Sequence, residues 1–402
     1  MAETLPLGKH HPQRGTAPDL KAFLSLGFRP LYIAGCGWAL IAVALWIFAP
    51  QWLTGPLGGI AWHAHEMLWG FIATIAVGFL LTASATWTGH NPMYGLPLAL
   101  LSVTWLVARI GYLAGGAPGF FIALTAESLF FFASAHSLMR VVLKGKNRRN
   151  DGIPFLVAGL GLSNILFLLA AYEGNYVKLM AQFNLGLVCM AVIALLIARR
   201  VIPFFSMRMV PGLQISMQTR SGQWQLAVSI VAILAGLLGF TKTMGAALGL
   251  VGIISLWQLI AWKPWAVRRK PMLWILYLGY AFMGAGLLLA ALHFSGLGVG
   301  PLARPATHIH TLGMGGFAVL IIGMVTRTAL GHLGRPLALD TGMLLSYYLI
   351  VAAVVLRLAA LFPSSATMGL LQASALCWIG AMGLYLWRYL PMLIRPRPDA
   401  LH

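Results

Sequence analysis

The chain has 402 residues, of which 60% are hydrophobic and only 9% are charged, and its formal net charge is +19. A soluble domain needs more polar residues than this to cover its surface, so the composition excludes a soluble protein and predicts that a lipid bilayer covers the outside. The basic residues lie in short clusters between apolar runs, without the continuous basic surface that nucleic-acid binding requires, so no nucleic acid partner is expected.

Apolar runs between turn and charge clusters predict an all-α fold, a polytopic membrane helix bundle of about twelve transmembrane helices. The expected spans lie near 28–50, 61–86, 93–114, 118–143, 152–172, 180–202, 224–241, 243–262, 272–295, 305–330, 340–362 and 366–390. Only Lys242 and Thr243 separate the seventh span from the eighth, and merging them would leave eleven spans. The twelve-span interpretation is preferred because it places most of the 27 Lys and Arg residues in cytoplasmic loops, as the positive-inside rule requires.

This topology places both termini in the cytoplasm. Residues 1–27 form an N-terminal tail without a cleavable signal, 28–390 form a single transmembrane bundle, and 391–402 form a C-terminal tail. The longest loop, 203–223, contains Pro203 and is expected to break the helix there and to act as a hinge between two halves. The halves would be 28–202 and 224–390.

Four histidines stand in two similar segments. Trp62-His63-Ala64-His65-Glu66-Met67 opens the second span, and Thr307-His308-Ile309-His310-Thr311 opens the tenth. Both spans run from outside to inside, so the four imidazoles are expected at a similar depth near the outer face. Ionisable residues are costly in a membrane and imidazole is the commonest metal ligand, so all four are candidate metal ligands. Because residues i and i+2 point about 200° apart on a helix, each pair can serve two different centres.

Haem is the more specific interpretation of this cluster. Glycine lets a helix approach a porphyrin closely, and both spans supply glycines near their histidines. These glycines are Gly70 and Gly78 in the second span and Gly313, Gly315 and Gly316 in the tenth. Arg304 lies just before His308 and is a candidate partner for a haem propionate.

Copper is the second interpretation. His63 with Met67, and His310 with Met314, are i,i+4 pairs on one helical face, and a thioether suits copper(I). Histidines that are simply solvated or hydrogen-bonded at the interface are the alternative without a metal.

Charged residues inside the spans are the remaining candidates. Glu66 lies between the metal candidates and is a candidate catalytic group that carries protons. The alternative is that it orients a histidine through a hydrogen bond. Arg109, near the end of the third span, is expected to neutralise Glu127 in the fourth in a structural pair.

Several motifs resemble the NnrS family. They are Phe28-Arg29-Pro30-Leu31-Tyr32, the stretch Trp62 to Phe71, Gly78 to Thr82 with Trp87-Thr88-Gly89, His310 to Arg327, Leu330-Gly331-His332, and Gly334 to Leu337. Because they lie in order from the first span to beyond the tenth, the resemblance covers most of the chain. It implies a bacterial inner-membrane protein of twelve helices that carries haem b and copper and is associated with denitrification and the response to nitric oxide.

The resemblance carries over to individual positions. His63, His65 and His310 match the family's histidines, and Arg327, His332 and Arg335 match its signature after the tenth span. His308 departs from the pattern, because an apolar residue is more usual there. His332 is expected on the cytoplasmic side, a bilayer away from the other histidines, so it cannot share their metal.

The preferred interpretation is a haem and copper site near the periplasmic face that binds nitric oxide and either reduces or sequesters it, in the manner of a nitric oxide reductase-type oxidoreductase. His65 and His310 are the candidate haem ligands, with Arg304 on a propionate, and His63 and His308 are left for copper. The electron donor, a quinol or a redox protein, stays open.

Two other functions stay open. One is a transporter or exporter of copper or haem, although a carrier would concentrate its polar residues at the midplane. The other is a quinol-linked b-type electron-transfer cytochrome, which a second haem near His136 would favour.

Overall fold

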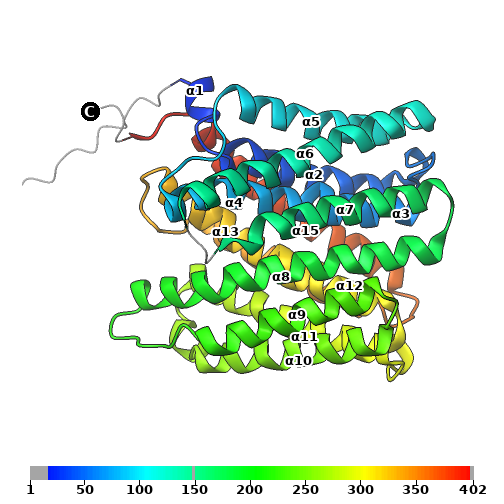
Figure 1. Cartoon of the computed structure of the whole chain (residues 1–402). Coiled ribbons are helices and arrows are strands. Elements are labelled where there is room, and N and C mark those ends of the chain that lie inside the picture. Colours follow the sequence, from blue (N-terminus) through cyan, green and yellow to red (C-terminus); the bar gives the residue numbers. More distant parts are fainter. Residues whose placement is uncertain (1–16, 147–149, 399–402) are drawn as a thin grey trace, which may run out of the picture.

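A computed structural model describes residues 17–146 and 150–398 (Figure 1). Within these ranges the chain is helical and contains no strand, which confirms the predicted all-α fold. Eleven of the described helices are long and apolar enough to cross a membrane, so the chain is a multi-pass membrane protein. The outer parts of the two predicted tails, 1–16 and 399–402, lie outside the described residues.

Ten long helices are continuous α-helices. They are α2 (Phe28–Phe48), α5 (Leu96–Ala114), α6 (Gly116–Lys144), α7 (Gly152–Tyr172), α8 (Tyr176–Met209), α9 (Thr219–Leu237), α10 (Thr241–Ala261), α11 (Pro271–Ser295), α14 (Thr341–Ala359) and α15 (Thr367–Leu393). The short elements between them are α1 (Leu20–Phe23) and the 3₁₀ turns η1 (Pro50–Trp52), η4 (Pro264–Val267) and η5 (Gly300–Ala303).

Two crossings are composite, and they are the two that carry the histidine pairs. The second consists of α3 (Gly59–His65), the π-helical segment η2 (Glu66–Ala73) and α4 (Thr74–Thr88), and the tenth of α12 (Pro305–His310), the π-helical segment η6 (Thr311–Ala318) and α13 (Val319–His332). The two π-helical segments contact each other. The second and tenth spans therefore meet inside the bundle as expected, and π-helical turns of this kind are frequent at functional sites.

The seventh and eighth spans are separate helices. The helix α9 ends at Leu237 and α10 begins at Thr241, and the two pack together. Gly239 makes the connection with a φ of +77°, which glycine adopts without steric cost. The helix α9 has a polar first turn and is not among the eleven most apolar helices, but it completes the set of twelve long segments.

Both described ends of the chain lie at the same end of the bundle. The backbone N–H of Asp19 donates to the carbonyl of Ile394 at 2.9 Å, and Nη1 of Arg29 donates to the carbonyl of Leu393 at 2.9 Å. Two ends on one side require an even number of crossings, which supports twelve spans over eleven. We call this the terminal end; α3 and α12 begin at the opposite end, called the histidine end (Figure 1).

The helix α8 is longer than the sequence predicted. It was expected to end at 202, but it continues through Pro203 to Met209, and the loop shortens to 210–218. Proline removes one backbone donor, which a buried helix tolerates where its neighbours hold it. Here Ser206 donates to the carbonyl of Ile202 at 2.8 Å and lies 3.0 Å from the Tyr277 hydroxyl of α11. Pro203 is therefore no helix break, and a hinge within the remaining loop stays a prediction.

Candidate functional site

His63 and His310 face each other at the histidine end. Their ring centroids are 6.5 Å apart and their planes differ by 19°. His63 comes from α3 and His310 from α12, so the contact joins the two composite crossings. Trp46, near the end of α2, stacks on His63, with ring centroids 5.0 Å apart. The apolar ring of Trp46 therefore covers one face of the His63 imidazole.

The hydrogen bonds of His310 and His63 differ. Nδ1 of His310 lies 2.7 Å from the carbonyl oxygen of Ala306, an acceptor, so Nδ1 carries the proton and Nε2 keeps a lone pair for a ligand. Nδ1 of His63 is buried and has no hydrogen-bond partner among the described residues. His310 is thus oriented by the protein, whereas one nitrogen of His63 still lacks a partner.

A glycine that borders open space and a positively charged side chain lie near this pair. A Cβ placed on Gly313, three residues after His310, would meet no atom within 4 Å. The guanidinium of Arg357, on α14, is close enough to act electrostatically on both rings. Two imidazoles on opposite sides of one metal, each about 2 Å from it, have ring centroids about 6 Å apart. The separation, the free nitrogens and the cation fit a haem with carboxylate side chains.

His65 lies in a different place from His63, although both come from α3. It is fully buried, with Nδ1 2.9 Å from Oε1 of Glu66 and Nε2 2.9 Å from Oδ1 of Asn164 and 3.0 Å from Oε2 of Glu127. Both ring nitrogens face acceptors, so neither keeps a lone pair for a metal. The structure therefore differs from the sequence-based pairing of His65 with His310.

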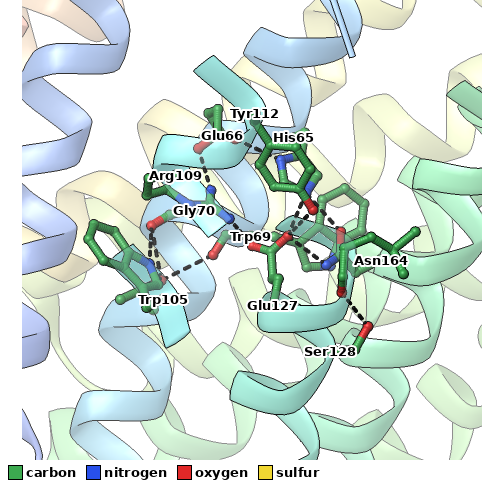
Figure 2. A network of polar contacts seen from close by, with 12 residues as sticks. His65, Glu66, Trp69, Gly70, Trp105, Arg109, Tyr112, Glu127, Ser128 and Asn164 are labelled. Carbon is green, nitrogen blue, oxygen red and sulfur yellow. Dashed lines mark hydrogen bonds and ion pairs between the residues drawn. The ribbon is translucent and has the colours of Figure 1, made fainter. Parts of the chain in front are cut away.

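Glu66 belongs to a buried charge network rather than standing unpaired (Figure 2). One carboxylate oxygen accepts from Trp38 Nε1 at 2.5 Å and from Arg109, and the other faces His65. Arg109 also pairs with Glu127, as the sequence predicted, and Tyr112 donates to Glu127 at 3.0 Å. With every carboxylate oxygen engaged, the expected role of Glu66 as an unpaired proton carrier does not match this arrangement.

The π-helical turn of η2 is held by side chains. A π-helix pairs its carbonyls with backbone N–H groups five residues further on, and side-chain donors can add hydrogen bonds to the same carbonyls. The hydroxyl of Thr74 donates to the carbonyls of Gly70 and Trp69 at 2.9 and 3.1 Å, and Trp105 Nε1 donates to Thr74 at 2.8 Å. Met67 and Met314 lie in the two π-helical segments, so their alignment with His63 and His310 as i,i+4 pairs of a regular α-helix stays a prediction.

The glycines near the histidines mostly serve helix packing and not the close approach of a porphyrin. A Cβ on Gly70 would clash with Arg109 and would lie 2.5 Å from Oε2 of Glu66. Gly315 and Gly316 make room for Phe282 and Met283 of α11, and Gly78 makes room for Leu31 of α2. Only Gly313, of the five expected glycines, borders open space.

His308 lies beside His293 and is also close enough to His310 to act on it electrostatically. The ring centroids of His308 and His293 are 4.8 Å apart. His293 was missed from the sequence, although its position in the last turn of α11 places it at the same end of the bundle as the other histidines. The sequence analysis also did not assign Arg357, on α14, to the site.

Arg304 does not contact the predicted haem ligands in the structure. Its side chain is exposed, and Nη1 donates to the carbonyl of Leu361 at 3.0 Å. Arg357, and not the predicted Arg304, is the cation that acts electrostatically on His63 and His310. Across residues 17–146 and 150–398, no group of three or more His, Cys, Asp or Glu side chains is arranged to hold a metal ion by itself.

Comparison with known proteins gives one match over nearly the whole chain. The model of the NnrS protein family matches residues 22–397. A search of curated proteins found no match. The matched region includes all twelve long helices, the imidazole pair and the buried charge network. The chain therefore belongs to the NnrS family, membrane proteins associated with haem, copper and the response to nitric oxide.

Proposed function

We propose that this chain binds nitric oxide at a haem held between His63 and His310, near the periplasmic face of a bacterial inner membrane, and reduces or sequesters it during nitrosative stress or denitrification. The observation that carries the proposal is the pairing of these two imidazoles at 6.5 Å across the contact of the second and tenth spans. Family membership supplies the cofactor class and the physiological setting.

The two histidines have unequal roles in this proposal. His310 is the permanent ligand, because its Nδ1–H is fixed by the carbonyl of Ala306 and its Nε2 is free. His63 is the weaker ligand, since no hydrogen bond orients its Nδ1 within the described part of the chain. His63 would therefore be the imidazole that yields its place to nitric oxide. When bound, ferrous haem supplies the affinity for nitric oxide.

Arg357 and the charge network position this pair. Arg357 presents a cation to a haem propionate on the side of the two imidazoles. The network of Glu66, Arg109 and Glu127 fixes η2 directly after the histidine segment and so fixes the direction of His63. Glu66 is a positioning residue in this proposal.

The orientation belongs to the same proposal. The terminal end carries the positively charged loops, among them Lys263 to Lys270 and Arg395, whereas the histidine end carries few cations. Positive loops favour the cytoplasm, so both termini lie there and the imidazole pair faces the periplasm. Reduction would convert two molecules of nitric oxide to nitrous oxide and water with two electrons and two protons, and we propose a quinol or a periplasmic redox protein as the donor.

The test is a reduced-minus-oxidised optical spectrum of the purified full chain in detergent, with haem and metal content, for the wild type and for His310→Ala and His63→Ala. We expect His310→Ala to lose most of the haem, and His63→Ala to keep haem in a five-coordinate form. His136→Ala is the control, because His136 is exposed on α6. Unchanged haem content and spectrum in both site variants would overturn the ligand assignment.

Nitric oxide turnover is then measured with the haem-loaded protein. The reduced wild type is mixed with nitric oxide in the presence of a quinol, and nitric oxide loss and nitrous oxide formation are followed together. Loss with nitrous oxide supports reduction, and a haem nitrosyl spectrum without nitrous oxide supports sequestration. A haem protein that gives neither result would overturn the nitric oxide proposal.

A further inference from the structure

We infer that His293 and His308 form a second metal site that binds one copper(I) ion through two imidazoles, separate from the His63–His310 pair. The inference deepens the proposed function, because it names a copper site beside the proposed haem. It rests on the pairing of a ring from the last turn of α11 with a ring from α12.

The first observation is the burial of His308. Its side chain is 1% exposed, and neither Nδ1 nor Nε2 has a hydrogen-bond partner among the described residues. A buried polar atom without a partner destabilises the fold, and a neutral imidazole always presents one nitrogen donor and one acceptor. A ligand that binds one of these nitrogens removes part of this destabilisation.

The second observation is the orientation of His293. Its Nδ1 lies 2.9 Å from the carbonyl oxygen of Ala303, on η5, so Nδ1 carries the proton and Nε2 keeps the lone pair. Histidines that bind metals usually donate their second ring N–H to a carbonyl or carboxylate in this way. His293 is thus in the tautomer that a metal requires.

The third observation is the distance between the rings. The centroids of His293 and His308 are 4.8 Å apart and the planes differ by 33°. Two imidazoles bound to one metal at a tetrahedral angle have centroids about 5 Å apart, against about 6 Å for ligands on opposite sides. This pair therefore fits neighbouring ligands on one ion, whereas His63 and His310 fit opposite ligands.

The choice of metal follows from charge. The aromatic ring of Phe294 lies against both imidazoles, with its centroid 5.1 Å from that of His293 and 5.6 Å from that of His308. Within the described ranges, no third His, Cys, Asp or Glu joins the pair in a metal-binding arrangement. Neutral ligands leave the charge of the ion uncompensated, and the cost of burying an ion rises steeply with its charge. A monovalent ion that accepts imidazole, copper(I), suits the site better than zinc or copper(II).

The experiment is copper(I) binding to the purified full chain after removal of copper with a chelator under reducing conditions. Copper(I) is titrated in competition with bicinchoninate, and haem content is measured on the same samples. We expect His308→Phe and His293→Ala each to weaken the binding of one copper(I) per chain at least tenfold, with haem content unchanged. His136→Ala is the matched control and should bind as the wild type does.

The choice of His308→Phe ensures that a loss of copper binding is not caused by a loss of folding. His308→Phe removes two unpartnered nitrogens and keeps an aromatic ring, so it should be at least as stable as the metal-free wild type. Copper(I) should raise the melting temperature of the wild type but not of His308→Phe. X-ray absorption of the copper(I) complex should show imidazole nitrogen ligands.

Unchanged copper(I) affinity in both folded variants would overturn the inference, as would tighter binding of zinc than of copper(I) at this site. The outcome is independent of the proposed function. If the wild type binds copper(I) through His293 and His308 but holds no haem, the haem proposal fails and the copper site stands. If His310→Ala loses haem while His308→Phe keeps copper, the copper site fails alone.

Discussion

Arg109 of α5 and Glu66 of η2 form an ion pair that solvent does not reach, with side-chain exposures of 1% and 0%. Arg109 also pairs with Glu127, so one cation joins the second, third and fourth spans of the bundle. A buried charge that loses its partner is strongly destabilising, because its desolvation is no longer compensated.

Replacement of Arg109 by Met should therefore destabilise the fold by about 3–5 kcal/mol, since Glu66 and Glu127 would remain buried without their cation. The measurement is the thermal unfolding of the purified protein in detergent, followed by tryptophan fluorescence. Lys178→Ala is the control, because Lys178 and its partner Glu173 are 64% and 55% exposed. An exposed pair contributes at most about 1 kcal/mol. Equal stability of the two variants would contradict the structural role of the network.

Gly70→Ala should disturb the same network from the backbone side. A Cβ at this position would clash with Arg109 and lie 2.5 Å from Oε2 of Glu66, neither of which has free space to move in the buried network. We expect a loss of about 1–3 kcal/mol in unfolding free energy. Gly331→Ala serves as the comparison, because a Cβ there meets nothing within 4 Å and alanine favours a helix by up to about 1 kcal/mol. Wild-type stability of Gly70→Ala would contradict the prediction, because it would show that Arg109 and Glu66 move away from the added Cβ at no cost.

His65→Gln should lower stability but keep the haem. Both nitrogens of His65 are bound by Glu66, Asn164 and Glu127, so the side chain serves the charge network and not a metal. The haem content of His65→Gln is compared with that of His310→Gln by the pyridine haemochrome assay on monodisperse samples. If His65→Gln lost its haem while His63→Gln kept the wild-type haem content, the ligand pair predicted from the sequence would be restored.

The orientation of the bundle predicts which loops react from outside the cell. In a variant whose native cysteines Cys36, Cys189 and Cys377 are replaced by alanine, single cysteines are introduced at Lys178 and Lys263. A membrane-impermeant maleimide should label Lys178→Cys in intact cells, and Lys263→Cys only after the inner membrane is permeabilised. Labelling in the reverse order would place the histidine end in the cytoplasm.

The sequence predicted the fold well because the membrane imposes its requirements locally. A run of apolar residues long enough to cross the bilayer must be a helix, whatever its neighbours are. The separation of α9 from α10 was predicted correctly from Lys242, Thr243 and the charge distribution, but the break lies at Gly239, and Lys242 and Thr243 belong to the first turn of α10. The helix α8 was predicted too short because Pro203 is compatible with a helix when tertiary packing supports it, and a local pattern does not contain that packing.

The sequence also placed Arg109 beside Glu127, since two opposite charges inside adjacent spans have few other partners. It did not predict that Glu66 and His65 join them. Those contacts depend on the rotation of each helix about its own axis, and the π-helical segments after His65 and His310 change that rotation. Arg357 and His293 were missed for the same reason, because they come from spans without a motif.

By itself, the sequence determined the number of long helices, the family, and the end of the bundle at which the histidines lie, because hydropathy, charge and motif order are properties of the chain read residue by residue. Only the tertiary structure decided which imidazoles meet. His63 faces His310, His308 faces His293, and His65 is bound by carboxylates. Each pairing follows from the angle at which neighbouring helices pack, and that angle is fixed by side chains distant in sequence.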